Sequence, residues 1–303
     1  MIRLGDVLGQ DEAVAMLRDG FARTRLHHSL LFVGPRGVGK HTTARALAAA
    51  LFCAGGGADA CGECVPCRQV IAGTHPDLAT MELPPVKPSA DPRERRKRAL
   101  SIDQVREMQA ALGRRPIAGT RRVAIVDDAE TLSEEAQNAL LKTLEEPPPE
   151  SFLILVSATG SALRPTVRSR CQRVTFRALD TATLERALIE RFEKPAEEAR
   201  ELAAHAEGSV GRALSPHLGR IREATAAVDR VLASLRSGYR DALEAAGALE
   251  AIEAALARPP EKIAAPVVEM IVEILWKRLR RDAAGPLALD GGETTDGLTA
   301  PEK

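Results

Sequence analysis

The chain has 303 residues, enough for two domains or three small ones, and 42 Lys and Arg against 42 Asp and Glu give it a net charge of zero. A free-standing nucleic-acid-binding domain is usually basic, and single-strand-binding platforms stack bases on aromatic side chains, which make up only 3% of this chain. Both classes are therefore disfavoured. No apolar run approaches the length of a transmembrane helix, and Arg3 and Asp6 interrupt the start of the chain. We expect a soluble, cytoplasmic protein that is rich in helix.

The first part of the chain alternates helical and strand patterns. Val14, Leu17 and Phe21 lie on one face of a predicted helix, and the apolar run Leu30–Val33 stops at Gly34-Pro35, as a buried strand does at a loop. The elements expected here are helices over 10–25 and 40–52 and a strand over 30–33. Residues 82–98 contain four prolines and the basic run Arg93–Arg98, which predicts an exposed loop; the alternative is contact with DNA phosphates.

The same alternation continues to residue 178. Ser101 is a candidate N-cap for a helix around Ile102, Val105, Met108 and Leu112, and Val123–Val126 is a second buried strand. A helix over 133–145 and strands over 152–156 and 174–176 follow. Strands that alternate with helices predict an α/β domain whose parallel sheet is covered on both faces.

After residue 178 the pattern is wholly helical. The expected helices are 181–192, 196–206 and 209–217, and then three longer amphipathic stretches at 219–236, 240–257 and 260–281. The last residues are rich in Gly, Thr, Asp and Pro, which is typical of a flexible tail. We therefore predict four parts: an α/β domain over 1–178, a small helical unit over 179–218, a helical domain over 219–282, and a tail over 283–303.

Residues 34–40, Gly-Pro-Arg-Gly-Val-Gly-Lys, form the G-x-x-x-x-G-K part of a P-loop between a strand and a helix. In such a loop Gly34, Gly37 and Gly39 would let backbone N–H groups approach phosphates, and Lys40 would reach the outer phosphates. The next position normally carries the hydroxyl that holds Mg²⁺, and here it is His41. Thr42 is no replacement, because one residue along a helix turns the side chain by about 100°.

The second nucleotide-binding element shows a similar departure. Asp127 follows the strand 123–126, where the magnesium-linked aspartate of a P-loop enzyme stands, but the residue after it is Asp128 and not the longer Glu that activates water. A displacement of about 1 Å can cost on the order of 100-fold in rate. The two departures argue against an efficient ATPase. The alternative is that the loop only joins strand to helix, and binding of ATP without hydrolysis stays open.

Four of the five cysteines, Cys53, Cys61, Cys64 and Cys67, fall within 15 residues. In a chain without secretion signals such a cluster favours a metal site over disulfides, and four thiolates suit tetrahedral Zn²⁺. Four protein ligands leave no open position for water, so the predicted role of the module 53–70 is structural. Free thiols are the alternative. Cys171 lies too far along the chain to belong to the site, and we interpret His75 as a turn or packing residue.

Several motifs together resemble the AAA+ subunits of the bacterial replicative clamp loader, part of DNA polymerase III. They span about residues 5–215 and are Gly9-Gln10, His28, the loop 34–40, the four cysteines, the run Asn138–Pro148, Pro165-Thr166 and Ser169-Arg170-Cys171. Any one of these motifs alone would be weak. The zinc-type insert combined with Leu-Leu-Lys-Thr-Leu-Glu-Glu-Pro and Ser-Arg-Cys is specific to this family.

Two subunit types in the family carry both features, the ATPase motor (gamma/tau) and the stator (delta-prime). His41 and Asp128 depart from the motor pattern in the direction of the stator. The resemblance thus implies a P-loop α/β domain, a helical lid over 179–218 and a helical collar over 219–282 that assembles with motor and delta subunits. In this family the assembled subunits form a ring that places a sliding clamp on primed DNA. An active motor subunit is the alternative, and a stand-alone zinc-bearing interaction module is a third.

The resemblance also implies a role for Arg170, as an arginine finger that reaches the ATP site of a neighbouring motor subunit. Such a residue stabilises charge on the transferring phosphoryl group. The alternative is a structural salt bridge. Ser157 or Thr159 would be the polar sensor after the strand 152–156, and the residues do not decide between them. Arg212 matches the lid's sensor segment with a shift of one position, so it is expected to cap a helix or to face solvent.

Overall fold

The structure, a computed structural model, describes residues 3–83 and 99–215. The five strands are β1 (Ser29–Val33), β2 (Leu78–Met81), β3 (Arg122–Val126), β4 (Ser151–Ser157) and β5 (Gln172–Thr175). The helices are α1 (Asp11–Ala22), α2 (Lys40–Phe52), α3 (Val65–Ala72), α5 (Ile102–Leu112), α6 (Glu134–Glu145), α7 (Pro165–Arg168), α8 (Thr181–Phe192), α9 (Ala196–His205) and α10 (Val210–Ala213). Short 3-10 turns lie at η1 (Leu4–Asp6), η2 (Ala129–Thr131) and η3 (Gly160–Ala162).

The strands form one parallel sheet in the order β2-β3-β4-β1-β5. In register, Ser29 of β1 stands opposite Leu153 of β4, Leu30 opposite Gln172 of β5, and Val123 of β3 opposite Phe152. The predicted parallel α/β domain is therefore confirmed. Because all five strands run in the same direction, the segments that follow them meet at one edge of the sheet.

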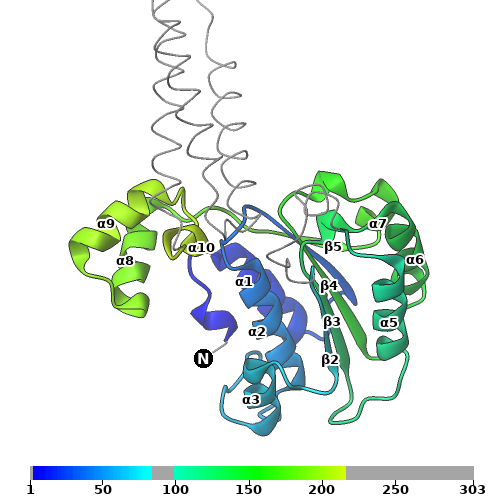
Figure 1. The fold of residues 1–303 in the computed structure, drawn as a ribbon. Coiled ribbons are helices and arrows are strands. Elements are labelled where there is room, and N and C mark those ends of the chain that lie inside the picture. The colour runs from blue at the N-terminus through cyan, green and yellow to red at the C-terminus, as the bar shows by residue number, and fades with distance from the viewer. Residues whose placement is uncertain (1–2, 84–98, 216–303) are drawn as a thin grey trace, which may run out of the picture. The chain divides into compact units, whose positions relative to one another are not determined.

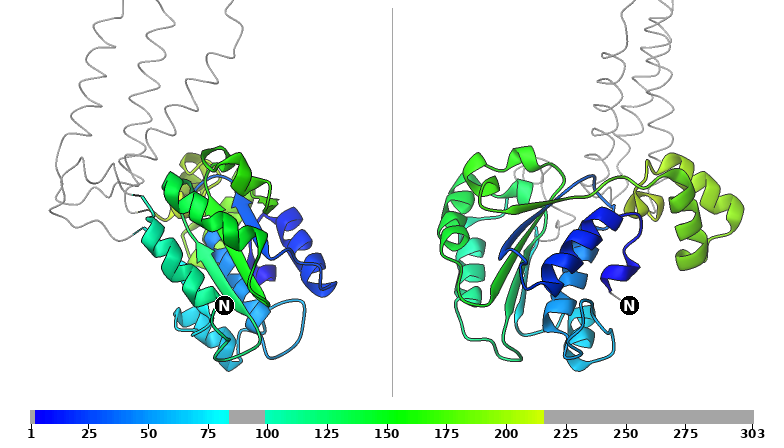
Figure 2. Two further views of the ribbon diagram at one scale, coloured as in Figure 1. Left: turned by 90° about the vertical axis from the view of Figure 1, so that its right-hand side faces the viewer. Right: turned by 180° about the vertical axis from the view of Figure 1, so that it is seen from behind.

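Helices cover both faces of the sheet, with α1 and α2 on one side and α5, α6 and α7 on the other (Figures 1 and 2). Side chains alternate between these layers along each strand, as the two-residue period of a strand requires. Toward the first layer point Leu30, Phe32, Val123, Ile125, Ile154 and Val156. Toward the second point Leu31, Val33, Ala124, Val126, Leu153 and Leu155. Burial on both faces explains why β1, β3 and β4 read as continuous apolar runs.

The edge strands are where the sequence analysis was least accurate. It did not predict β2, and it placed β5 at 174–176, two residues late. β2 buries only Met81 fully, and β5 only Val174, because each pairs with a single neighbour in this sheet. Neither strand therefore has a continuous apolar run. The helices α3 and α7 were also not predicted.

Side-chain caps start several helices where the sequence indicates. Ser101 Oγ accepts the N–H of Gln104 while the Gln104 side chain accepts the N–H of Ser101, a complete capping box for α5. Ser133 caps α6 and Asp180 caps α8. Interactions of this kind typically contribute about 1 kcal/mol each.

The helices predicted after residue 178 begin where expected, as α8, α9 and α10. Gly208 has φ +73°, and a Cβ there would lie 2.3 Å from the carbonyl oxygen of Leu179, so only glycine fits this junction. The predicted collar and tail and the basic run Arg93–Arg98 lie outside the described residues, and the division at 178/179 stays a prediction. Within 3–83 and 99–215, every helix is too short or too polar to cross a bilayer.

Candidate functional site

The P-loop lies at the carboxyl edge of the sheet, between β1 and α2. The ends of the neighbouring strands bring Glu82, Asp127 and Ser157 to the same edge, since these residues follow or end β2, β3 and β4. This edge is where parallel α/β sheets bind ligands. The structure therefore assembles the predicted loop with the predicted Asp127.

The three positions of the loop that carry glycine require it for different structural reasons. A Cβ on Gly34 would lie 2.3 Å from the carbonyl oxygen of Phe176, and one on Gly37 would lie 2.3 Å from Ser209 Oγ. Packing within this chain thus accounts for both. Gly39 has φ +99°, which demands glycine, and a Cβ there would meet no heavy atom within 4 Å. The open space that a phosphate would need therefore lies over Gly39.

Lys40 is buried, and its ammonium group is directed at the loop itself. Nζ donates hydrogen bonds to the carbonyl oxygens of Gly34 and Pro35, at 2.6 Å each. Burial lowers the pKa of Lys40 to about 8, although the carboxylates of Glu130 and Asp127 oppose that shift. The lysine that was expected to reach phosphates is thus hydrogen-bonded to the backbone of the P-loop itself.

Arg36, in the middle of the loop, connects the loop to the segment after β3. Its Nη2 lies 3.1 Å from Glu130 Oε1 and 3.4 Å from Asp128 Oδ1. The other oxygen of Glu130 accepts the N–H of Ala158, just beyond β4. Glu130 therefore joins the ends of three elements. Asp128 itself has a left-handed backbone, with φ +47°.

His41 lies in the first turn of α2, next to the segment that follows β2. Its Nε2 lies 3.7 Å from Glu82 Oε1, close enough for an ion pair when the imidazole is protonated, and accepts or donates no hydrogen bond among the described residues. An imidazole next to a carboxylate is not the hydroxyl that a Mg²⁺-nucleotide site uses.

The two candidates for the polar sensor differ in environment. Ser157 is buried, and its hydroxyl donates to the carbonyl oxygen of Thr159 at 2.8 Å. Thr159 is exposed and lines a cavity of about 560 Å³ together with Arg168 and Arg173. The carbonyl oxygen of Ser157 accepts the N–H of Gly34 at 3.4 Å, but within the described ranges neither side chain forms a hydrogen bond with the loop 34–40. The choice between them stays open.

Arg212 differs from the expectation. Its side chain is buried, and its Nη1 pairs with Glu207 Oε2 at 2.9 Å, so the expectation of a solvent-facing side chain is wrong. Ser209, and not Arg212, caps α10. The segment packs on the P-loop, because Gly211 N–H donates to the carbonyl oxygen of Gly37 at 3.0 Å. Burial follows from that packing, which no local pattern reveals.

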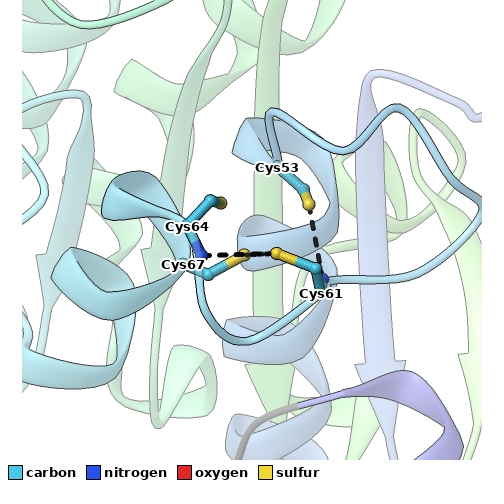
Figure 3. A group of neighbouring side chains, drawn as sticks. All are labelled: Cys53, Cys61, Cys64 and Cys67. Carbon is cyan, nitrogen blue, oxygen red and sulfur yellow. Dashed lines mark hydrogen bonds between the residues drawn. The ribbon is translucent and has the colours of Figure 1, made fainter.

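The four cysteines of the insert converge. Their sulfur atoms all lie within 4.8 Å of one another, and Figure 3 shows them directed into one shared space. The Sγ atoms of Cys61 and Cys67 are 4.0 Å apart. Tetrahedral zinc with Zn–S bonds of roughly 2.3 Å places its sulfur ligands about 3.8 Å apart. The set can hold a metal ion, and its size is compatible with zinc.

Backbone N–H groups donate to the sulfur atoms of this cluster and favour the thiolate of Cys61. Cys53 Sγ accepts the N–H groups of Gly55 and Cys61 at 3.4 and 3.3 Å, and Cys61 Sγ accepts that of Cys64 at 3.4 Å. The hydrogen bond from Cys64 is the main reason why the pKa of Cys61 falls to about 6. Burial raises the pKa of Cys67 to about 12. Donors of this kind orient ligands around a metal.

The module is anchored to the N-terminal turn. Asp59 accepts the N–H groups of Leu4, Gly5 and Ala60 and pairs with Arg18 Nη2 at 2.5 Å. These interactions hold η1 and α1 against the insert. The module also extends beyond residue 70, because α3 ends at Ala72.

Cys171, the remaining cysteine, and His75 both pack against neighbouring side chains. Cys171 packs against the core layer that the sheet forms with α5, α6 and α7, and burial raises the pKa of its thiol to about 12. The ring of His75 stacks on that of Phe52 with centroids 3.9 Å apart, and its Nδ1 accepts the N–H of Asp77. Both observations agree with the interpretations made from the sequence.

Arg170 lies just after α7 and is partly exposed. Its Nη2 lies 2.6 Å from Glu145 Oε1, at the end of α6, and its Nη1 donates to the carbonyl oxygen of Thr166 at 3.0 Å and to Ser169 Oγ at 3.4 Å. Among the described residues these are the polar contacts of its side chain, and none is with the loop 34–40. Sequence reasoning missed Glu130 and Glu145. Glu145 belongs to the Glu-Glu-Pro run used for the resemblance, and no signal marked Glu130.

Comparisons with known proteins agree with the resemblance. The family model described as "DNA polymerase III, delta subunit" matches residues 9–180. Subunit delta' of Pseudomonas aeruginosa is 37% identical over 208 residues, which cover 68% of this chain and 60% of that protein. Subunit delta' of Bacillus subtilis is 31% identical over 61% of this chain and 53% of its own length. Subunit tau/gamma of Haemophilus influenzae is 35% identical over 69% of this chain and 30% of its own length.

The chain thus spans between about a third and three fifths of these curated relatives. The segment that the family model matches, residues 9–180, contains the P-loop, the four cysteines and Arg170, whose geometry is described above. Because the family model covers more than half of the 303 residues, the chain belongs to the DNA polymerase III delta subunit family.

Proposed function

We propose that the chain is the stator (delta-prime) subunit of the bacterial clamp loader, which assembles with gamma/tau motor subunits and delta to load the sliding clamp onto primed DNA. Family membership and relatives named subunit delta' support this assignment. Clamp and DNA would be reached through the complex. The helices α8–α10 would form the lid, and residues 219–282 the collar that joins the ring.

The observation that carries the proposal is the ion pair between Asp128 and Arg36 at 3.4 Å. In an active site the residue at position 128 would act as general base and would need a carboxylate free to accept a proton from water. Here the shorter side chain is held by a guanidinium of the P-loop. A water molecule would have to compete with Arg36 for this carboxylate, so the ion pair opposes general-base catalysis.

His41 and Lys40 support the same assignment. The imidazole of His41 lies beside Glu82 and offers no hydroxyl to Mg²⁺, and Lys40 donates to two carbonyls of its own loop. A nucleotide would have to displace these contacts. We propose that this chain does not hydrolyse ATP.

Arg170 would act in a neighbouring subunit. Its contacts are with α6 and the α7 segment, and its side chain is partly exposed, so the guanidinium is available to a partner at the surface. In the ring it would supply positive charge to the phosphates bound by a motor subunit. Arginine fingers of other NTPases contribute roughly 10³- to 10⁵-fold in rate.

The four cysteines would hold one Zn²⁺ as a structural ion. Cys53, Cys61, Cys64 and Cys67 would be its ligands, and with all four positions filled the ion would bind no water. The ion would fix the connection between α2 and α3. It would thereby support the contacts of Asp59 with the N-terminal turn.

ATP turnover by the reassembled complex tests the proposal. Lys40→Ala in this chain should leave clamp- and DNA-stimulated turnover almost unchanged, because its own loop does not hydrolyse ATP. Arg170→Ala should reduce turnover clearly but not completely, because other motor sites keep their own fingers. Neither change should affect assembly of the complex, which size-exclusion chromatography measures.

The alternative is a motor subunit. Two relatives, named subunit tau/gamma and subunit tau and 35% and 36% identical, favour it, as does the presence of Lys40. A complex disabled by Lys40→Ala and indifferent to Arg170→Ala would establish the motor role and overturn the stator assignment.

A further inference from the structure

Glu145 and Arg170 come from different elements and meet at the surface. Glu145 is the last residue of α6, and Arg170 follows α7, 25 positions later in the chain. The shortest distance between them is 2.6 Å, from Arg170 Nη2 to Glu145 Oε1, with the two side chains 36% and 51% exposed. Glu145 stands at the negative end of a helix dipole, where an anion is unfavourable and a nearby cation is stabilising.

The guanidinium is anchored from two sides. Nη1 donates to the Thr166 carbonyl and to Ser169 Oγ, which fixes it to the turn that carries Arg170, and Nη2 is held by α6. A guanidinium has five N–H groups. Among the described residues these contacts leave Nε–H and one Nη2–H without a protein acceptor. Two donors on one planar group suit the two oxygens of a phosphate.

From this geometry we propose that Glu145 is a positioning residue: it holds the Arg170 guanidinium in the orientation from which it meets the phosphates of a neighbouring subunit. The inference rests on the proposed finger role of Arg170. Without Glu145 the side chain would be fixed only by the turn to which it belongs. More of its rotamer freedom would then be lost when it engages phosphate, which raises the barrier to the step that it assists.

The magnitude follows from the exposure of the pair. Exposed ion pairs contribute little, so removal of Glu145 should lower kcat by about 5-fold at most, much less than the loss of Arg170 itself. The Michaelis constant for ATP should be unchanged, because the P-loop of the motor subunit, and not Glu145 of this chain, binds the nucleotide. The effect should therefore appear in kcat and not in KM.

The experiment uses the full chain in the reassembled loader, with saturating clamp and primed DNA. Glu145→Ala is compared with Glu145→Gln, which keeps an acceptor oxygen, and with Glu146→Ala, which removes the same charge one residue later from an exposed side chain. Arg170→Ala and the double variant Arg170→Ala/Glu145→Ala complete the set. Thermal melting and size-exclusion chromatography establish that each variant folds and assembles.

We expect Glu145→Ala to lower kcat, Glu145→Gln to recover part of it, and Glu146→Ala to match the wild type. The double variant should equal Arg170→Ala, since Glu145 acts through that arginine. An unchanged or raised kcat for Glu145→Ala, or a further loss in the double variant, would overturn the positioning role. If Arg170→Ala itself had no effect, the finger role would fail, which is a distinct outcome.

Discussion

Arg122 Nη2 lies 3.4 Å from Asp77 Oδ1, and the side chains are only 7% and 0% exposed. Asp77 also accepts the N–H groups of Ile117 and Ala118, at 2.8 Å each. Arg122 donates to the carbonyl oxygens of Arg114 and Arg115. This buried pair therefore holds the loop between α5 and β3 against the start of β2.

Asp77→Ala should destabilise the fold strongly. The change leaves a buried guanidinium without its counter-ion and two N–H groups without acceptors, which typically costs about 3–5 kcal/mol. The matched control is Asp103→Ala, whose carboxylate pairs with Arg106 at 3.5 Å but is 80% exposed and should contribute less than about 1 kcal/mol. Urea unfolding of the two variants measures the difference. Equal losses would show that burial of the first pair is unimportant.

One zinc ion per chain should co-purify with the protein. Cys64→Ser should release it and lower the melting temperature by roughly 5 °C or more, the shift that about 2 kcal/mol produces in a domain of this size. Cys171→Ala is the control, because that cysteine lies outside the cluster, and it should keep full zinc content. Elemental analysis and thermal melting test both changes. A folded preparation without zinc would rule out the site.

Lys40 should make stability depend on pH. Its folded pKa of about 8 lies below the usual 10.5, so between these values the unfolded chain binds more protons and stability rises with pH. Comparison with Lys40→Met isolates this contribution, since all other groups titrate in both proteins. From pH 7 to pH 10 the wild type should gain about 2 kcal/mol relative to the variant. Denaturant unfolding at both pH values provides the measurement, and a constant difference would contradict the shift.

A chain that ends at residue 218 should remain folded but should not join the complex. It keeps every residue that the structure describes, including both core layers of the sheet and the four cysteines. Circular dichroism and zinc content would test folding, and co-elution with motor subunits would test assembly. If the truncated chain still co-elutes, assembly through the predicted collar is wrong.

Short-range patterns in the sequence explain which elements of the fold could be predicted. The apolar runs of β1, β3 and β4 are short-range patterns that predicted these strands correctly, and the spacing of the four cysteines predicted a cluster that can hold a metal ion. The caps at Ser101 and Asp180 act within three residues. The edge strand β2 was missed because, with one sheet neighbour, it carries little apolar signal.

Amino-acid order alone therefore determined the α/β layering, the helices other than α3 and α7, and the cysteine cluster that can hold a metal ion, because these depend on periodicity and on residue types within a few positions. Only the tertiary structure decided the charged partners. Arg36 meets Glu130 across 94 positions, Asp77 meets Arg122 across 45, and Glu145 meets Arg170 across 25. The chain has 42 basic and 42 acidic side chains, so the sequence allows too many possible ion pairs to predict which of them form. The fold selects among them by bringing particular strand ends and helix ends within a few ångströms.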